Sequence, residues 1–207
     1  MTDRFRPTQI RSRLHTLSQK PKYKLFPDRS TQNRTSFQRA AVLIALTEID
    51  GKMHVVLTKR SAHLREHSGE VSFPGGKMDA TDPDLLHTAL REAQEEICLD
   101  PSIVTAHGVL LSMPTITGYA VTAWVGEYPQ PYDLNANPSE IESLLMAPLD
   151  ELADPSIHRI ESREFNGREF PIHFFEIQDF TIWGATGWML HTLLDFLGFR
   201  SQPTSVL

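Results

Sequence analysis

The chain has 207 residues, of which 40% are hydrophobic and 22% are charged, and its formal net charge at pH 7 is −6. This length suits one domain with a sizeable core. The negative charge argues against nonspecific binding to nucleic acid or to an anionic membrane surface, because both depend on basic patches. Cys98 is the single cysteine, which excludes an intrachain disulfide and is typical of a reducing cytosol.

The N-terminal part of the chain is polar and basic. Its first residues lack the apolar segment of a signal peptide, and the longest apolar run, Ala40–Leu46, is too short to span a bilayer. We therefore expect a cytoplasmic protein with no membrane partner. Ile10–Leu17 suits a short helix, and Pro21–Asn33 has the composition of a connector.

A hairpin is expected next. Ala41–Leu46 has the unbroken apolar character of a buried strand, and His54–Leu57 suits the returning strand. Asp50-Gly51 between them is a turn dipeptide that favours a tight connection, because both residue types accept a positive φ.

The segment after this hairpin contains the pattern H-x-x-E-H at His63–His67, which is typical of some zinc peptidases. That chemistry needs both histidines on one face of a stable helix. Ser68 and Gly69 follow at once and no long apolar helix surrounds the motif. We therefore favour ordinary surface or loop histidines over a zinc site here.

A helix is predicted after Gly75-Gly76. Asp82 suits its N-cap, because the carboxylate can accept from the free N–H groups of the first turn, and Pro83 suits the first helical position. A buried stripe follows at three- and four-residue spacing, made of Leu86, Ala89, Leu90, Ala93 and Ile97.

The same helix carries a cluster of carboxylates, Glu92, Glu95 and Glu96, on one side of the stripe. Like charges at this spacing destabilise an isolated helix by about 0.2–0.5 kcal/mol per pair, a penalty that a divalent cation would remove. Oxygen ligands suit Mg²⁺ or Mn²⁺ better than Zn²⁺. A solvated acidic face is the alternative, but Gly75-Gly76 favours the metal site, because a phosphate can approach backbone that lacks side chains.

Several elements are expected farther along the chain. The apolar patterns predict strands at Val104–Leu111, Val121–Gly126 and Pro171–Ile177, a short helix at Glu140–Leu145, and a closing apolar helix at Gly184–Leu197. Strands and helices that mix without a regular βαβ repeat favour a mixed sheet between helices.

The carboxylate helix resembles the Nudix box, G-x5-E-x7-R-E-U-x-E-E-x-G-U, in which U is a bulky aliphatic residue. The match is strong at Gly76 and through Arg91–Glu96. Asp82 stands where the box has its first Glu, one extra residue separates it from Arg91, Ala93 is small for U, and Cys98 replaces the last Gly.

This resemblance implies roles for the residues that match. Glu92 and Glu96 are expected to bind metal, and Glu95 to support them or to act on water. Arg91 is expected to hold the helix through an acidic partner, for which Asp79 and Asp82 are both candidates. Cys98 is expected at the helix C-terminus, where a left-handed conformation costs a non-glycine residue about 1 kcal/mol.

The residues from Leu57 to Gly76 resemble the signature of the coenzyme A pyrophosphatase branch, L-L-T-x-R-[SA]-x3-R-x3-G-x3-F-P-G-G. The matching residues are Leu57, Thr58, Arg60, Ser61, Arg65, Gly69, Phe73, Pro74, Gly75 and Gly76. Arg60 and Arg65 can donate forked hydrogen bonds to phosphate oxygens. The alternative is that they are surface arginines paired with Glu66 and Glu70.

The Nudix resemblance implies an α/β fold, an α/β/α sandwich with a mixed β-sheet, over roughly residues 39–197. We divide the chain into an N-terminal extension at 1–35, a Nudix hydrolase domain at 36–200 and a C-terminal tail at 201–207. The resemblance also makes a homodimer plausible.

The expected reaction is hydrolysis of the pyrophosphate bond of coenzyme A or a derivative, with Mg²⁺ or Mn²⁺ as cofactor and a substrate site that includes Arg60, Arg65, Gly75 and Gly76. The expected products are 3′,5′-ADP and 4′-phosphopantetheine. Glu95 and Glu140 are both candidates for the general base. The alternatives are another nucleoside diphosphate substrate, such as ADP-ribose, and a non-catalytic nucleotide-binding module.

Overall fold

The computed structural model describes residues 5–18, 37–62, 69–165 and 167–199. Within them, a seven-stranded sheet has the order β3-β2-β1-β6-β5, with β4 paired to β1 and β7 paired to β2. Its strands are β1 (Gln38–Ile49), β2 (Lys52–Arg60), β3 (Val71–Ser72), β4 (Gly75–Lys77), β5 (Thr105–Pro114), β6 (Tyr119–Glu127) and β7 (Ile141–Pro148). β1 runs parallel to β6 and antiparallel to β2 and β4, so the sheet is mixed.

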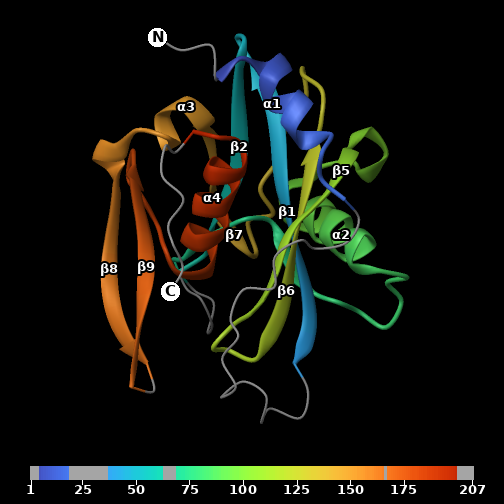
Figure 1. The fold of residues 1–207 in the computed structure, drawn as a ribbon. Coiled ribbons are helices and arrows are strands. Elements are labelled where there is room, and N and C mark those ends of the chain that lie inside the picture. Colours follow the sequence, from blue (N-terminus) through green and yellow to red (C-terminus); the bar gives the residue numbers. More distant parts are fainter. Residues whose placement is uncertain (1–4, 19–36, 63–68, 166, 200–207) are drawn as a thin grey trace.

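The central strand β1 is buried on both faces, because successive side chains of a strand point to opposite sides. Leu43 and Ala45 face helix α2 (Leu85–Ile97), whereas Ile44 and Leu46 face helix α4 (Gly184–Phe196). Figure 1 shows the two helices on opposite faces of the sheet. The expected α/β/α sandwich with a mixed sheet is therefore confirmed.

A second sheet lies beyond α4, on the side away from the large sheet (Figure 1). It contains β8 (His158–Phe165), β9 (Arg168–Ile177) and β10 (Phe180–Ile182) in the order β10-β9-β8. Phe175 and Ile177 of β9 are buried in the same core cluster as Leu190 and Leu194 of α4. Of these strands, the sequence predicted only β9.

The N-terminal helix α1 (Pro7–Leu14) joins the main core, since its Ile10 and Leu14 are fully buried there. Arg11 of α1 donates to Glu127 at the end of β6, with 2.7 Å from Nε to Oε1. The predicted short helix near residue 10 is confirmed, although it begins earlier, at Pro7. The connector expected at Pro21–Asn33 lies outside the described residues.

The predicted hairpin is confirmed, with Ile49 opposite Lys52 and positive φ angles at Asp50 (50°) and Gly51 (74°). The expected strands around 104–111 and 121–126 are β5 and β6, and the closing helix is α4. Three short helices complete the described elements: η3 (Pro101–Ile103), α3 (Leu149–Leu152) and η4 (Pro155–Ile157).

Two other predictions about secondary structure are wrong, and the first concerns the start of helix α2. Helix α2 begins at Leu85 with Asp84 as its N-cap, whose carboxylate accepts from the His87 N–H at 2.9 Å. Asp82 is therefore not the cap, and Pro83 is not the first helical residue. The carboxylate of Asp82 instead accepts hydrogen bonds from the side chains of Thr88 and Arg91, which lie farther along the chain.

The second error concerns the short helix expected at Glu140–Leu145. This segment enters strand β7, which pairs antiparallel with β2. Its deeply buried residues, Ile141, Leu145 and Ala147, are an even number of positions apart, as a strand with one face in the core requires. The segment is a strand because it pairs with β2, and β2 is too far away in the chain for a local sequence pattern to predict this.

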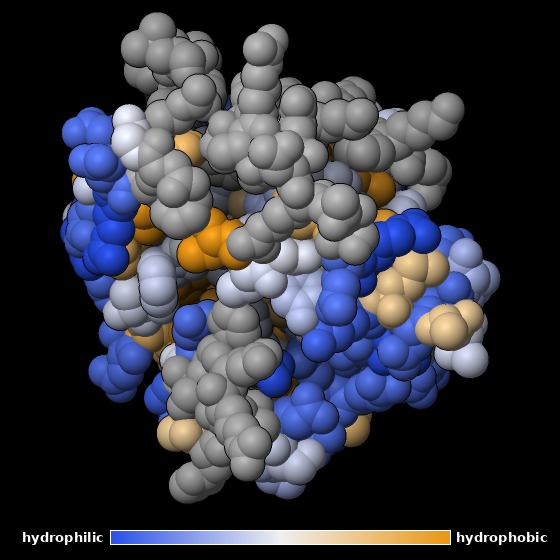
Figure 2. All heavy atoms as spheres, turned by 90° about the horizontal axis from the view of Figure 1, so that it is seen from below, coloured by the Kyte–Doolittle hydropathy of each residue, from blue (hydrophilic) through white to orange (hydrophobic). Residues whose placement is uncertain are grey.

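No helix in the described part of the chain has the length and apolar composition needed to cross a membrane. Viewed from below, the surface is largely hydrophilic, with some apolar side chains near its centre (Figure 2). Among the described residues, the large hydrophobic side chains that remain exposed are Ile116, Ile160 and Trp183.

Candidate active site

Helix α2 buries its apolar stripe, including Ala89, Ala93 and Ile97, against the large sheet. This packing gives the three glutamates of the helix different exposures. The side chain of Glu96 is 3% exposed, that of Glu92 is 16% exposed and that of Glu95 is 55% exposed. The carboxylates one turn apart, Glu92 and Glu96, are therefore the ones held inside the protein.

The Glu96 carboxyl lies between β4 and the end of β2. It accepts from the Gly75 N–H at 3.2 Å and from Nη1 of Arg60 at 3.3 Å. Burial raises the pKa of Glu96 to about 8, and the positive charge of Arg60 opposes this rise. A cation bound at this carboxyl would favour its ionised form.

Glu92 lies directly against Gly76. A Cβ atom at Gly76 would be 2.5 Å from Cδ of Glu92, so a side chain there would displace this carboxylate. Burial also raises the pKa of Glu92, with Arg91 acting in the opposite direction. Gly75 and Gly76 belong to strand β4, so the missing side chain at Gly76 makes space for a carboxylate of the protein itself.

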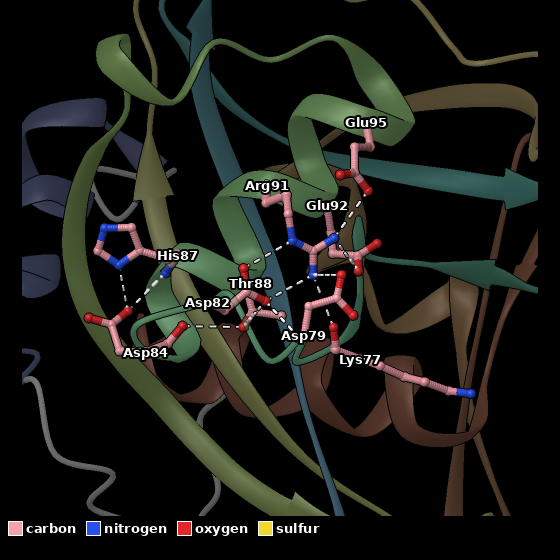
Figure 3. Close-up of polar contacts among 9 residues, drawn as sticks. All are labelled: Lys77, Asp79, Asp82, Asp84, His87, Thr88, Arg91, Glu92 and Glu95. Carbon is pink, nitrogen blue, oxygen red and sulfur yellow. Dashed lines mark hydrogen bonds and ion pairs between the residues drawn. The ribbon is translucent and has the colours of Figure 1, made fainter.

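Arg91 is the centre of a hydrogen-bond network (Figure 3). Its Nε donates to Oδ1 of Asp82 and its Nη2 donates to Oδ2, both at 3.0 Å. Nη2 also donates to the Lys77 carbonyl at 3.0 Å, whereas its distance to Asp79 is 4.0 Å. Of the two candidate partners, Asp82 therefore makes the forked pair.

Further contacts fix Asp82. Its Oδ2 accepts from the Asp79 N–H at 2.9 Å and from the Thr88 hydroxyl at 3.0 Å. The hydrogen bond from Arg91 is the main cause that lowers the pKa of Asp82 to about 2, so this buried side chain is ionised at neutral pH.

The remaining guanidinium nitrogen of Arg91, Nη1, points toward the glutamates (Figure 3). It donates to Oε1 of Glu92 at 2.9 Å and to Oε2 of Glu95 at 3.1 Å. One arginine thus connects the buried Asp82 to two carboxylates of α2, and it sets their positions relative to strand β4.

Glu140 joins the cluster from another part of the chain. It lies in a turn just before β7, where its carbonyl accepts from the Ser61 N–H at 2.8 Å. The charge of Glu140 adds to the effect of burial in raising the pKa of both Glu92 and Glu96. No helix begins at Glu140, so the expectation of a helical position for it is wrong.

Arg60 at the end of β2 contacts this cluster through Glu96. Its Nε is buried and has no hydrogen-bond partner within the described residues. The pairing of Arg60 with Glu96 spans 36 positions and has no local signal in the sequence. Arg65 and the H-x-x-E-H pattern at residues 63–67 lie outside the described residues.

A cavity of about 380 Å³ lies near the end of β2. Gly69 and Glu70 line it, and both make backbone hydrogen bonds with Arg60. The other lining residues are Lys59, Val71, Asp179, Phe180, Thr181 and Trp183. The contribution of β10 could not be predicted from the sequence, because those residues are about 120 positions from β2 in the chain.

Cys98 follows α2 as its C-cap with a φ of 56°, so the predicted left-handed conformation is confirmed. Its N–H donates to the Gln94 carbonyl at 3.0 Å, and its side chain is exposed.

The donor set of the cluster is made of oxygen atoms. The charges of Glu92 and Glu140 help to raise the pKa of Glu96, and the charge of Glu140 helps to raise the pKa of Glu92. Hard cations such as Mg²⁺ and Mn²⁺ favour such carboxylates. The residues present therefore fit a divalent metal ion.

A family model described as the NUDIX domain matches residues 37–166. The chain is 42% identical over 161 residues to "Nudix hydrolase 15, mitochondrial" of Arabidopsis thaliana, a match covering 74% of this chain and 56% of that protein. It is 31% identical over 179 residues to "Uncharacterized Nudix hydrolase NudL" of Enterobacter sp. (strain 638), a match that covers 86% of this chain and 93% of that protein.

A crystal structure of a MutT/nudix family protein from Enterococcus faecalis has a similar fold, with a TM-score of 0.54 and 14% identity. The match covers 80% of this chain and 63% of that chain. Against the plant relative, this chain spans only a little over half of the other protein's length.

Proposed function

Because this chain belongs to the Nudix hydrolase family, we propose that it hydrolyses the pyrophosphate bond of coenzyme A or a coenzyme A derivative. The observation that carries the proposal is the position of Arg60. This residue belongs to the arginine signature that precedes the box, and its guanidinium contacts Glu96 of the carboxylate cluster.

We assign the metal site to Glu92 and Glu96, with Glu140 close to both. A Mg²⁺ or Mn²⁺ ion held there supplies positive charge to the pyrophosphate and acidifies a water molecule. Burial of Glu96 supports this assignment, since a carboxyl that is costly to ionise in the protein interior gains most from a nearby cation. Arg91 keeps Glu92 in position through its bond to Asp82.

We prefer Glu140 over Glu95 as the base that takes the proton from the attacking water. Glu95 is more than half exposed, and its carboxylate is already bonded to Arg91. Glu140 interacts with both proposed metal ligands. Water then adds across one P–O bond of the anhydride, which gives 3′,5′-ADP and 4′-phosphopantetheine or its acyl form.

The substrate assignment rests on cations and on the cavity. Coenzyme A carries a 3′-phosphate in addition to its pyrophosphate, so its site needs positive charge away from the metal. The buried Nε of Arg60 is available to a phosphate oxygen. Lys59, which pairs with Glu142, lines the cavity at the end of β2. Trp183 and Phe180 offer apolar walls there. Arg65 remains part of the proposal from its place in the signature.

The test is incubation of the protein with coenzyme A and Mg²⁺ or Mn²⁺, followed by chromatographic separation of the products. We expect 3′,5′-ADP and 4′-phosphopantetheine, loss of turnover on removal of metal, and loss of turnover in Glu96→Gln. Full metal-dependent turnover by Glu96→Gln would exclude the metal assignment.

ADP-ribose and nucleoside triphosphates serve as comparison substrates. Faster turnover of either would assign the protein to another Nudix substrate class. Tight binding of coenzyme A without any product would instead favour a nucleotide-binding module.

A further inference from the structure

Three histidines from three different elements meet on the outer side of α4. His158 begins β8, His173 lies in β9 and His191 lies in α4. One ring nitrogen from each lies within 4.8 Å of the other two, and Nε2 of His158 is 2.9 Å from Nδ1 of His173. Neither the Nudix motifs nor the coenzyme A signature includes any of these residues.

The fold brings the three rings together through two close contacts. On the hairpin, His173 is opposite Ile160, so His158 lies two positions away on the same face of the sheet. On α4, a Cβ atom at Gly187 would clash with the carbonyl oxygen of His173, so the absent side chain lets the helix approach β9. His191, one turn after Gly187, then stacks on His173 with 4.0 Å between ring centroids.

The cluster is unusual for a packing core. His173 is 1% exposed and His191 is 8% exposed, and His158 is half-buried at the open side. His158 and His173 share a ring-to-ring hydrogen bond of 2.9 Å, which uses one nitrogen of each ring. A metal ion instead uses the lone pair of each neutral ring.

The distances suit a metal after small side-chain rotations. Bonds of about 2.0–2.1 Å from nitrogen to Zn²⁺ place the ligands of a tetrahedron about 3.4 Å apart. The nitrogens here lie within 4.8 Å of one another, so each pair is within about 1.4 Å of that spacing. Three neutral imidazoles favour Zn²⁺, Co²⁺, Ni²⁺ or Cu²⁺ over Mg²⁺.

We propose that His158, His173 and His191 bind one Zn²⁺-type transition-metal ion and that this ion fastens the β8–β9 hairpin to α4. The site is distinct from the carboxylate cluster, because α4 and α2 lie on opposite faces of the large sheet (Figure 1). The fourth coordination position is left to water. Its three nitrogen ligands are those of known three-histidine zinc sites. The carboxylate cluster on α2 offers oxygen ligands instead, which Mg²⁺ prefers.

The experiment is a calorimetric titration of chelator-treated, full-length protein with Zn²⁺ in excess Mg²⁺, which occupies oxygen ligands but competes poorly for imidazole. We expect one Zn²⁺ per chain, a count that elemental analysis after dialysis repeats. His158→Ala is expected to weaken binding at least tenfold, since it removes one of three ligands while leaving the two buried rings in place.

Two controls identify the source of any binding. His87→Ala removes an exposed histidine from the start of α2 and is expected to leave zinc binding unchanged. The double variant His63→Ala/His67→Ala removes the H-x-x-E-H pattern and is also expected to bind one Zn²⁺. Loss of binding in the double variant, or unchanged affinity in His158→Ala, would overturn the proposal, as would absence of zinc binding by the wild type.

A second readout does not depend on stoichiometry. Trp188 lies 5.1 Å from His173 and 6.0 Å from His191, measured between ring centroids. Titration with Co²⁺ or Cu²⁺ is expected to quench tryptophan fluorescence in the wild type and not in His191→Gln, with circular dichroism confirming that this variant folds. Equal quenching in both proteins would contradict the assignment.

Discussion

Arg91 and Asp82 form a forked ion pair, with two hydrogen bonds of 3.0 Å that join residues nine positions apart. Both side chains also reach other parts of the site, since Arg91 bonds to Glu92 and Asp82 accepts from Thr88. The pair therefore connects the segment before α2 to the carboxylates that the helix carries.

Asp82→Asn is expected to destabilise the protein by about 3 kcal/mol, because it removes one charge from a largely buried ion pair. Asp79→Asn is the matched control. Its carboxylate is 4.0 Å from Arg91 and mostly exposed, so the expected loss is under about 0.5 kcal/mol. Urea denaturation measures both values, and equal losses would show that Arg91 does not distinguish the two aspartates.

The same pair predicts a pH dependence of stability. The pKa of Asp82 is about 2 in the folded protein, below its ordinary value of 3.8, chiefly because Arg91 bonds to the ionised form. The unfolded chain therefore binds a proton first as the pH falls, and the stabilisation from this group is present above pH 4 and lost between about pH 4 and pH 2. Unfolding free energies over this range should fall less steeply in Asp82→Asn than in the wild type.

Cys98→Gly is expected to stabilise the protein by about 1 kcal/mol, because glycine adopts the left-handed conformation at this helix end without the cost of a Cβ atom. Cys98→Ala is the control, since it removes the thiol but keeps Cβ. Thermal unfolding should show a gain for glycine only. A gain of the same size for alanine would assign the effect to the thiol.

Gly76→Ala is expected to displace the Glu92 carboxylate and to lower the affinity for Mg²⁺ at least tenfold, because the added Cβ has no room beside it. Lys77→Ala is the matched control. It changes the next residue of β4 and adds no atom near Glu92. Calorimetric titration with Mg²⁺ compares the two variants. Similar affinities for both would mean that Glu92 does not hold the metal.

Glu140→Gln is expected to lower kcat for coenzyme A hydrolysis by about 100-fold or more, which is the range for loss of a general base. Glu142→Gln is the matched control two residues away, where the carboxylate pairs with Lys59 at 2.7 Å. Any effect of the control should appear in KM and not in kcat. A normal kcat in Glu140→Gln, together with a loss in Glu95→Gln, would transfer the role to Glu95.

The sequence predicted features that depend on local spacing. The apolar stripe of α2, the grouping of its glutamates and the left-handed Cys98 follow from residues within a few positions of one another. The hairpin between β1 and β2 was predictable for the same reason, because Asp50 and Gly51 are adjacent.

Features that depend on tertiary contacts were missed. Asp82 and Asp84 are both residues of a type that favours the N-cap. Asp82 forms an ion pair with Arg91, and Asp84 caps the helix. Pairing with β2 turns the segment after Glu140 into a strand. The contact of Arg60 with Glu96 and the meeting of the three histidines join elements that are far apart in the chain.

The forked pair also shows how a chain can absorb a change in length. Aspartate is one methylene shorter than glutamate, and here it stands one residue farther from its arginine than the box allows, yet both oxygens are bonded. A pattern search that fixes the interval would reject this chain at that position. A search that scores the ion pair in three dimensions would accept it, and would recover other members whose loops differ in length.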